Sequence, residues 1–248
     1  MKNIFVVLVV VFFWSCKQDP HTEEAQKIID RSIEVAGGEL YKTSNIKFRF
    51  REIDYVLEQQ NGKRALKRIQ YSDSGRVTDI KRGNAFERFL DEKPLPVSDS
   101  MATVYGNSVN SVHYFALLPY GLNDAAVRKE LLGETQIKGK LFYKIKVSFD
   151  EQGGGNDYED VYLYWIDKES FTPGYLAYEF HTNGGGMRFR EAYNERYVNG
   201  IRFVDYNNYK PKGLTKVTEL DDLFEKGKLE LLSKIELENI EVSPGNYN

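Results

Sequence analysis

Residues 138–149 read KGKLFYKIKVSF, and this stretch sets the class of fold. Lys138-Gly139-Lys140 is typical of a turn. After it, apolar side chains recur at every second position, at Leu141, Tyr143, Ile145, Val147 and Phe149. A period of two is typical of a β-strand that buries one face and leaves the other toward solvent. Working outward from this strand, we find the same kind of pattern over most of the chain.

Strand-like stretches occur on both sides of residues 138–149. Their ranges are 45–57, 64–71, 76–81, 85–90, 127–137, 161–166, 175–181, 187–197, 201–209 and 229–242. Asn61-Gly62 and Asn199-Gly200 are dipeptides suited to two-residue hairpin turns. The apolar positions change phase at Arg51-Glu52 and again between Leu237 and Ile240, which predicts a β-bulge at each place. The sequence therefore predicts a long, mostly antiparallel sheet that bends.

Two segments have helical spacing. The first begins at Thr22, a plausible N-cap, and ends at Gly37-Gly38. In the second, 101–118, apolar residues step by three and four, and Asp99 or Ser100 would cap it. The predicted fold class is α+β, mostly antiparallel β: a curved sheet or half-closed β-barrel of about ten strands, with an N-terminal helix and an inner or covering helix.

Composition excludes several classes of protein. The 248 residues include 17 Tyr, 15 Phe and 2 Trp, but only 1 Cys and 3 His. A single cysteine excludes an internal disulfide framework. A formal charge of −3 makes a nucleic-acid-binding surface unexpected. The histidines have no metal-ligand spacing, so we expect neither a metal nor a cofactor.

The first sixteen residues have the features of a targeting segment. Residues 4–14 form an unbroken apolar run, which is too short to span a bilayer but suits a signal peptide. The following Phe13-Trp14-Ser15-Cys16 resembles a bacterial lipobox, although phenylalanine replaces the usual leucine. We therefore expect a signal peptide over 1–15, a lipidated tether over 16–21 and a single domain over 22–248. The alternative is an ordinary secretory signal with an incidental cysteine.

The cysteine also predicts a location. Lipidation at Cys16 would tether the protein to a bacterial membrane, because several buried acyl chains anchor stably. Lys17 follows the cysteine, where aspartate would suggest retention in the inner membrane. We therefore expect the protein in the cell envelope, at the outer membrane, with the periplasmic or surface side left open.

Several structural motifs together resemble the lipoprotein-carrier (LolA/LppX-like) superfamily, and within it an uncharacterised Bacteroidota lipoprotein family. They are the helix ending in Ala36-Gly37-Gly38, the segment 114–124 (YFALLPYGLND), the hairpin 139–149 and the closing hairpin around Asn199-Gly200. The resemblance covers about residues 22–210. It implies an open β-barrel around a helix with a hydrophobic cavity, and a ligand such as a lipid, an acyl chain or a lipoprotein anchor.

Aromatic and aliphatic residues on the predicted strands and second helix are the candidates for lining such a cavity. They are Phe48, Phe50, Val109, Val112, Phe115, Tyr143, Tyr164, Tyr178, Phe180 and Phe189. Aromatic residues are favoured in strands in any case, so the same residues would also build a filled core. The sequence does not separate the two interpretations.

Two further functions are open. A glycan-binding envelope protein would present exposed, coplanar Tyr or Trp rings on an outer face. A hydrolase would bring His113 together with Ser111 and Asp99, or use the acids Asp157, Glu159 and Asp160. A buried structural histidine and a solvated loop are the simpler interpretations of these residues. We expect a binding protein without catalytic residues.

Overall fold

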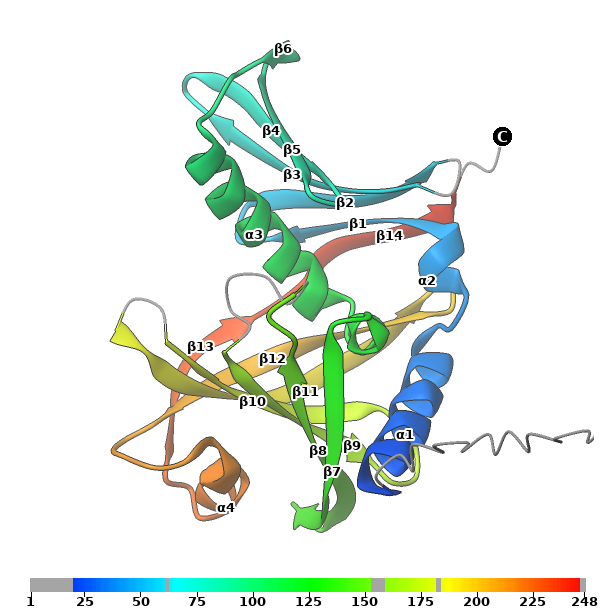
Figure 1. Ribbon diagram of the computed structural model, residues 1–248, viewed down its shortest axis with the longest axis vertical. Coiled ribbons are helices and arrows are strands. Elements are labelled where there is room, and N and C mark those ends of the chain that lie inside the picture. Colours follow the sequence, from blue (N-terminus) through cyan, green and yellow to red (C-terminus); the bar gives the residue numbers. More distant parts are fainter. Residues whose placement is uncertain (1–19, 61–62, 153–158, 182–183, 246–248) are drawn as a thin grey trace, which may run out of the picture.

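A computed structural model describes residues 20–60, 63–152, 159–181 and 184–245 (Figure 1). Its strands form two seven-stranded antiparallel sheets. The predicted class, α+β with mostly antiparallel curved sheet, is confirmed, although the two sheets do not close into a barrel. No helix in the described ranges is long and apolar enough to cross a membrane.

The first sheet, sheet A, contains the N-terminal strands and one strand from the other end of the chain. Each neighbouring pair is antiparallel. The order is β14 (Glu238–Pro244), β1 (Ser44–Phe50), β2 (Ile53–Gln60), β3 (Lys63–Ser72), β4 (Gly75–Arg82), β5 (Ala85–Leu90) and β6 (Lys93–Pro94).

The second sheet, sheet B, is a sequential meander with antiparallel neighbours throughout. The order is β13 (Leu229–Ile235), β12 (Ile201–Pro211), β11 (Gly186–Val198), β10 (Pro173–Phe180), β9 (Val161–Asp167), β8 (Lys140–Phe149) and β7 (Val127–Ile137). Residues 138–149 therefore form the β7–β8 turn and strand β8.

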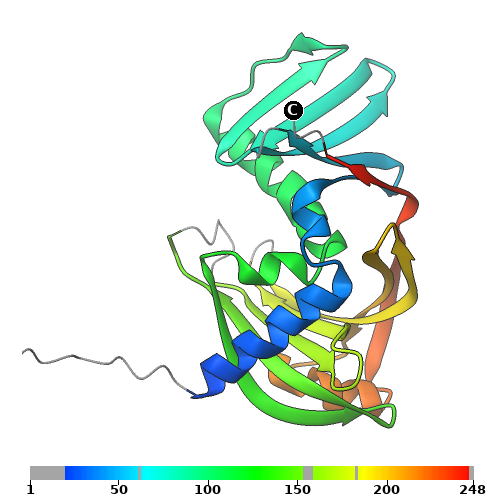
Figure 2. The ribbon, with the colours of Figure 1, turned by 90° about the vertical axis from the view of Figure 1, so that its right-hand side faces the viewer.

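Helices cover the sheets. Helix α1 (Pro20–Ala36) packs on β7, and α3 (Asp99–Ala116) lies across β3, β4 and β5 of sheet A (Figures 1 and 2). The shorter elements are α2 (Leu40–Thr43), η1 (Tyr120–Asn123), η3 (Val217–Glu219) and α4 (Leu220–Glu225). Ser98 caps α3, with its Oγ accepting from the Met101 amide, so the predicted caps Asp99 and Ser100 are wrong by one or two positions.

The predicted bulge at Arg51-Glu52 is wrong, because these residues form a hairpin turn. Both have positive φ angles, 51° and 61°, as a two-residue turn with right-handed twist requires. Strands β1 and β2 then pair with Ile46 opposite Leu57. The change of apolar phase in the sequence is therefore the point where the chain reverses, and the strands are more numerous than predicted.

The second predicted bulge is present, in β14. The register of β14 against β1 shifts between Glu238 and Glu241, and Asn239 has a φ angle of 50°. Just before it the chain leaves sheet B at Ile235 and enters sheet A at Glu238. The predicted strand over 229–242 is therefore two strands that link the sheets (Figure 1).

Two apolar cores follow from this arrangement. The main core joins α1, α3 and the facing surfaces of the two sheets, with Phe48, Leu57 and Phe203 among its fully buried side chains. The second core lies on the opposite face of sheet B, where η3 and α4 cover Trp165 and Phe142. Sheet B is thus apolar on both faces, and a ligand could in principle bind on either face.

Candidate functional site

The space between α3 and the sheets is filled by side chains. Phe48, Val109 and Tyr164 are fully buried in the main core. Phe50 is nearly buried and packs edge-to-face on Phe115 at 5.4 Å between ring centroids. These positions, predicted as candidates for lining a cavity, build packed core instead.

Other predicted lining residues are only partly buried, and they face the main core from α3 or from sheet B. Val112, Phe115, Tyr143 and Tyr178 pack against the main core without being enclosed by it. Phe180 lies two residues beyond Tyr178 on β10, on the same face, and is also partly buried.

Phe189 is the exception, because it points to the opposite face. It packs on Trp165 and Phe224 in the second core, at centroid distances of 5.4 and 4.8 Å. In the register of β10 and β11, Phe189 pairs with Ala177, whereas Tyr178 pairs with Arg188. Phe189 therefore cannot line the same surface as Tyr178, because side chains one position apart on a strand point to opposite faces.

Partly buried rings form a continuous row, which we call the aromatic strip. It starts on α3 and crosses β8, β9 and β10, with successive centroid distances of 6.4, 5.6, 5.6 and 6.0 Å. The rings are Tyr114, Phe149, Tyr162, Tyr178 and Phe180. Burial raises the pKa of Tyr114, and its hydroxyl has no hydrogen-bond partner among the described residues.

Two arginines of β11 lie on this strip. The Arg190 guanidinium sits 5.2 Å from the centroids of both Phe115 and Tyr178 and donates to the Tyr178 hydroxyl at 3.0 Å. The Arg188 guanidinium lies 5.0 Å from the Phe180 ring centroid and donates to the Met187 carbonyl. Neither forms an ion pair with a carboxylate of the described residues. The sequence analysis missed them, although their spacing of two places both on the face of Tyr178.

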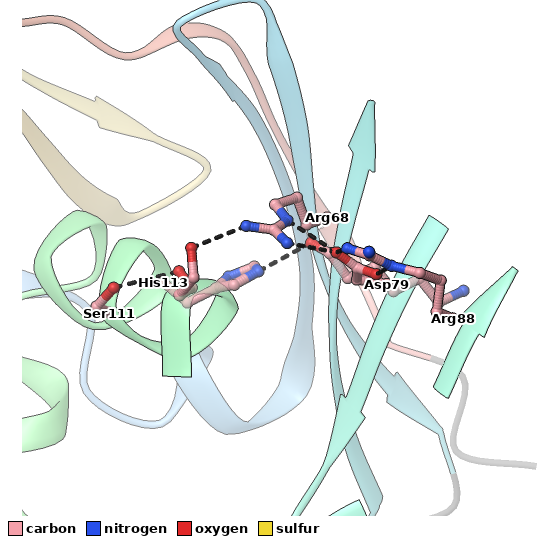
Figure 3. A network of polar contacts seen from close by, with 7 residues as sticks. Arg68, Asp79, Arg88, Ser111 and His113 are labelled. Atoms are coloured by element: carbon pink, nitrogen blue, oxygen red, sulfur yellow. Dashed lines mark hydrogen bonds and ion pairs between the residues drawn. The ribbon is translucent and has the colours of Figure 1, made fainter. Parts of the chain in front are cut away.

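A different polar cluster attaches α3 to sheet A (Figure 3). Asp79 is buried and accepts from two arginines, Arg68 at 2.5 Å and Arg88 at 2.6 Å. Arg68 also donates to Ser108 on α3, and Arg88 lies 3.5 Å from the Tyr105 ring centroid. Both guanidiniums are paired with this buried carboxylate, and each also contacts α3. The cluster therefore holds the helix on sheet A.

His113 is buried beside that cluster, and its ring hydrogen-bonds to the backbone and not to an acid or a nucleophile of the described residues. Its Nε2 lies 3.1 Å from the Lys67 carbonyl oxygen, and its ring packs edge-on against Phe48 and Tyr55. Burial lowers the pKa of His113 to about 4. The hydroxyl of Ser111 donates to the Ser108 carbonyl instead. Asp99 begins the same helix, about 21 Å along its axis from His113, so the three residues considered for a hydrolase do not meet.

Of the acids considered for the same function, the structure describes Glu159 and Asp160. Asp157 lies outside the described residues. Asp160 is buried with an oxygen 3.4 Å from Nδ1 of His181, and Glu159 is exposed. Within the described ranges, no three His, Cys, Asp or Glu side chains form a group that could hold a metal ion.

A pocket of about 420 Å³ lies on the α4 side of sheet B, and the sequence gives no signal for it. Its wall mixes apolar and polar side chains and includes the charged residues Lys140, Asp167, Glu195 and Arg202. Of the three rings that line it, Phe142 and Tyr175 are buried and Tyr193 is partly buried. Trp165 is fully buried as well, and Trp14 lies outside the described residues. This pocket therefore does not present the exposed, coplanar rings that are expected for glycan binding.

The fold defines an α+β protein with two curved antiparallel sheets and covering helices. The chain belongs to a family of unknown function, DUF6503, whose sequence profile matches residues 2–237. A comparison with curated protein sequences finds no match.

Several solved structures are similar to the chain. A LolA superfamily protein from Nitrosomonas europaea is 12% identical, with 88% of this chain and 91% of that chain covered and a TM-score of 0.46. A DUF1329 family protein from Desulfovibrio piger is 8% identical, with 88% and 92% covered and a TM-score of 0.46. The lipoprotein LppX from Mycobacterium tuberculosis is 13% identical, with 66% and 90% covered and a TM-score of 0.30.

Proposed function

We propose that this protein binds the apolar chain of an amphiphile against the aromatic strip and has no catalytic activity. The ligand class is a lipid, a free acyl chain or the acyl anchor of another lipoprotein. The observation that carries the proposal is the strip itself. Five rings from one helix and three strands stand in contact and remain only partly buried.

Physical chemistry favours an apolar ligand at such a surface. A row of contacting rings with apolar area left toward solvent gains about 25 cal/mol for each Å² that a ligand covers. The same sheet shows the alternative arrangement on its other face, where Phe189 and Trp165 are fully covered by α4 and its neighbours. The chain therefore has the means to cover aromatic residues fully, and it leaves those of the strip only partly covered.

We also propose that the protein is an outer-membrane-anchored lipoprotein of the bacterial envelope. Support comes from residues 1–16, where an apolar run ends at the chain's single cysteine. Cys16 would carry the lipid, 1–15 would be removed, 16–21 would form the tether and 22–248 a single domain. The last two residues of this tether, Pro20 and His21, belong to helix α1. A fixed binder of this kind would act as an acceptor or sensor rather than as a free shuttle.

Metabolic labelling with radioactive palmitate tests the anchor. The wild-type protein should incorporate the label and fractionate with membranes, whereas Cys16→Ser should do neither. Label retained in Cys16→Ser would refute the assignment of the anchor to this residue.

Binding of hexadecanol to the delipidated protein, followed by native mass spectrometry, tests the ligand surface. Phe180→Ser removes one ring of the strip and should weaken binding about thirtyfold, because covering such a ring contributes roughly 2 kcal/mol. Tyr71→Ser removes a ring that is 66% exposed on sheet A and serves as the matched control. Equal loss in both variants, or no binding by the wild-type protein, would refute the proposal.

A further inference from the structure

We infer that the ligand of the aromatic strip carries an anionic headgroup, a carboxylate or a phosphate, which binds to Arg190 with Arg188 beside it. This inference rests on the proposed function and specifies the class of its ligand. The site then has two parts, an apolar row for the chain and a cationic end for the headgroup.

Arg190 has hydrogen-bonding capacity that the described part of the protein leaves unused. Its Nη2 donates to the Tyr178 hydroxyl, but its Nε is buried and has no partner among the described residues. A buried donor without an acceptor costs about 1–3 kcal/mol. The same guanidinium lies over two rings, Phe115 and Tyr178, which hold its plane in place. An acceptor supplied by a ligand would complete this arrangement.

The same protein shows how it treats arginines that serve structure. Under α3, Arg68 and Arg88 are both bonded to the buried Asp79. Burial lowers the pKa of Arg64, against which Tyr120 and then Asp124 act, and its buried Nε likewise has no partner among the described residues. Arg188 and Arg190 differ from Arg68 and Arg88, because no carboxylate of the described residues pairs with either. A partly buried cation without a counter-charge is costly, which is the condition that an anionic ligand relieves.

The position of the two arginines matches an amphiphile. They lie two residues apart on β11, on the face that bears the strip, and each contacts one of its rings, Tyr178 for Arg190 and Phe180 for Arg188. A headgroup bound at Arg190 would therefore place its attached chain directly on the row of rings. Arginine suits this role because its planar donors match the oxygens of a carboxylate or phosphate.

Comparison of three ligands with the same apolar chain tests the inference in the wild-type protein. At pH 8, hexadecanoate and hexadecyl phosphate should bind about tenfold to a hundredfold more tightly than hexadecanol, as expected for a charge-assisted hydrogen bond. Inorganic phosphate, which has no chain, should bind far more weakly than hexadecyl phosphate. Inorganic phosphate that bound as tightly as hexadecyl phosphate would overturn the inference, because the site would then be a simple anion site.

Variants assign the preference to residues. Arg190→Gln should abolish the advantage of the anionic ligands over hexadecanol, and Arg188→Gln should reduce it. Lys234→Gln, which removes a cation lying 5.7 Å from the Tyr193 ring centroid elsewhere on sheet B, is the matched control and should leave it unchanged. A preference that persisted in Arg190→Gln would overturn the assignment.

The failures of the two proposals are distinguishable in the wild-type protein alone. If hexadecanol binds as tightly as hexadecanoate, the headgroup inference is overturned while binding of the apolar chain stands. If no amphiphile binds, the proposed function is overturned and the inference with it.

Discussion

Replacement of His113 by glutamine should remove a large part of the loss of stability in mild acid. His113 is fully buried against Phe48 and Tyr55, and burial lowers its pKa from 6.5 to about 4. Glutamine keeps a side-chain amide that can donate to the Lys67 carbonyl, but it does not titrate.

The sign follows from which state binds the proton. Above pH 6.5 the histidine is neutral in both the folded and the unfolded protein and contributes no pH dependence. As the pH falls from 6.5 to about 4, the unfolded chain binds a proton that the folded protein does not, so the free energy of unfolding decreases. A pKa difference of this size corresponds to about 3 kcal/mol, reached at pH 4 and constant below it.

Urea unfolding, followed by circular dichroism from pH 7.5 to 4, measures the effect. Subtracting the wild-type curve from that of His113→Gln cancels the contribution of the carboxylates, which is common to both proteins. The difference should rise by about 3 kcal/mol between pH 6.5 and pH 4, whatever the stability of the variant at pH 7.5. His181→Gln, at an exposed position, is the matched control. A flat difference curve for His113→Gln would show that the histidine charges in the folded state and would refute the reasoning.

Two further substitutions test the packing of the sheets. Asp79→Asn leaves Arg68 and Arg88 without a counter-charge and should lower the free energy of unfolding by about 3–5 kcal/mol. The control Glu87→Gln, at an exposed ion pair, should lower it by less than about 1 kcal/mol. Similar losses for both variants in urea unfolding would contradict a structural role of the Asp79 cluster. Gly174→Ala places a Cβ 2.8 Å from Cε1 of Phe142 and should cost about 1–3 kcal/mol, and an unchanged melting temperature would contradict the close packing there.

The period of two in the sequence predicted a strand correctly where the apolar positions kept one phase and a recognisable turn dipeptide marked its end. The alternation after Lys138-Gly139 became β8, and Asn199-Gly200 became the turn between β11 and β12. It failed at Arg51-Glu52, because these residues lack the composition of a positive-φ turn and a reversal leaves the same phase change as a bulge. Only the pairing of Ile46 with Leu57 separates the two.

The candidate site was predicted in part, for a reason that lies in sheet B. Both faces of this sheet are apolar, so an aromatic residue such as Phe189 gives no sign of which face it occupies. Tyr178 and Phe180, both candidate lining residues, lie two positions apart on one face of β10. Arg188 and Arg190 were passed over because charged residues on a strand usually face solvent, and their contacts with rings arise only from the pairing of β10 with β11.

The origin of β14 has a consequence for the order in which the protein folds. In sheet A, β1 pairs on one side with β2, its immediate neighbour in the chain, and on the other with β14, so that Ser44 lies opposite Pro244. Contacts so distant in sequence form slowly, because a long loop must close before they can contribute. Until β14 arrives, β1 presents an open edge to any other extended chain. In a crowded compartment, a holdase chaperone that masks β1 would therefore raise the yield of folded protein more than one that acts on the sequential meander of sheet B.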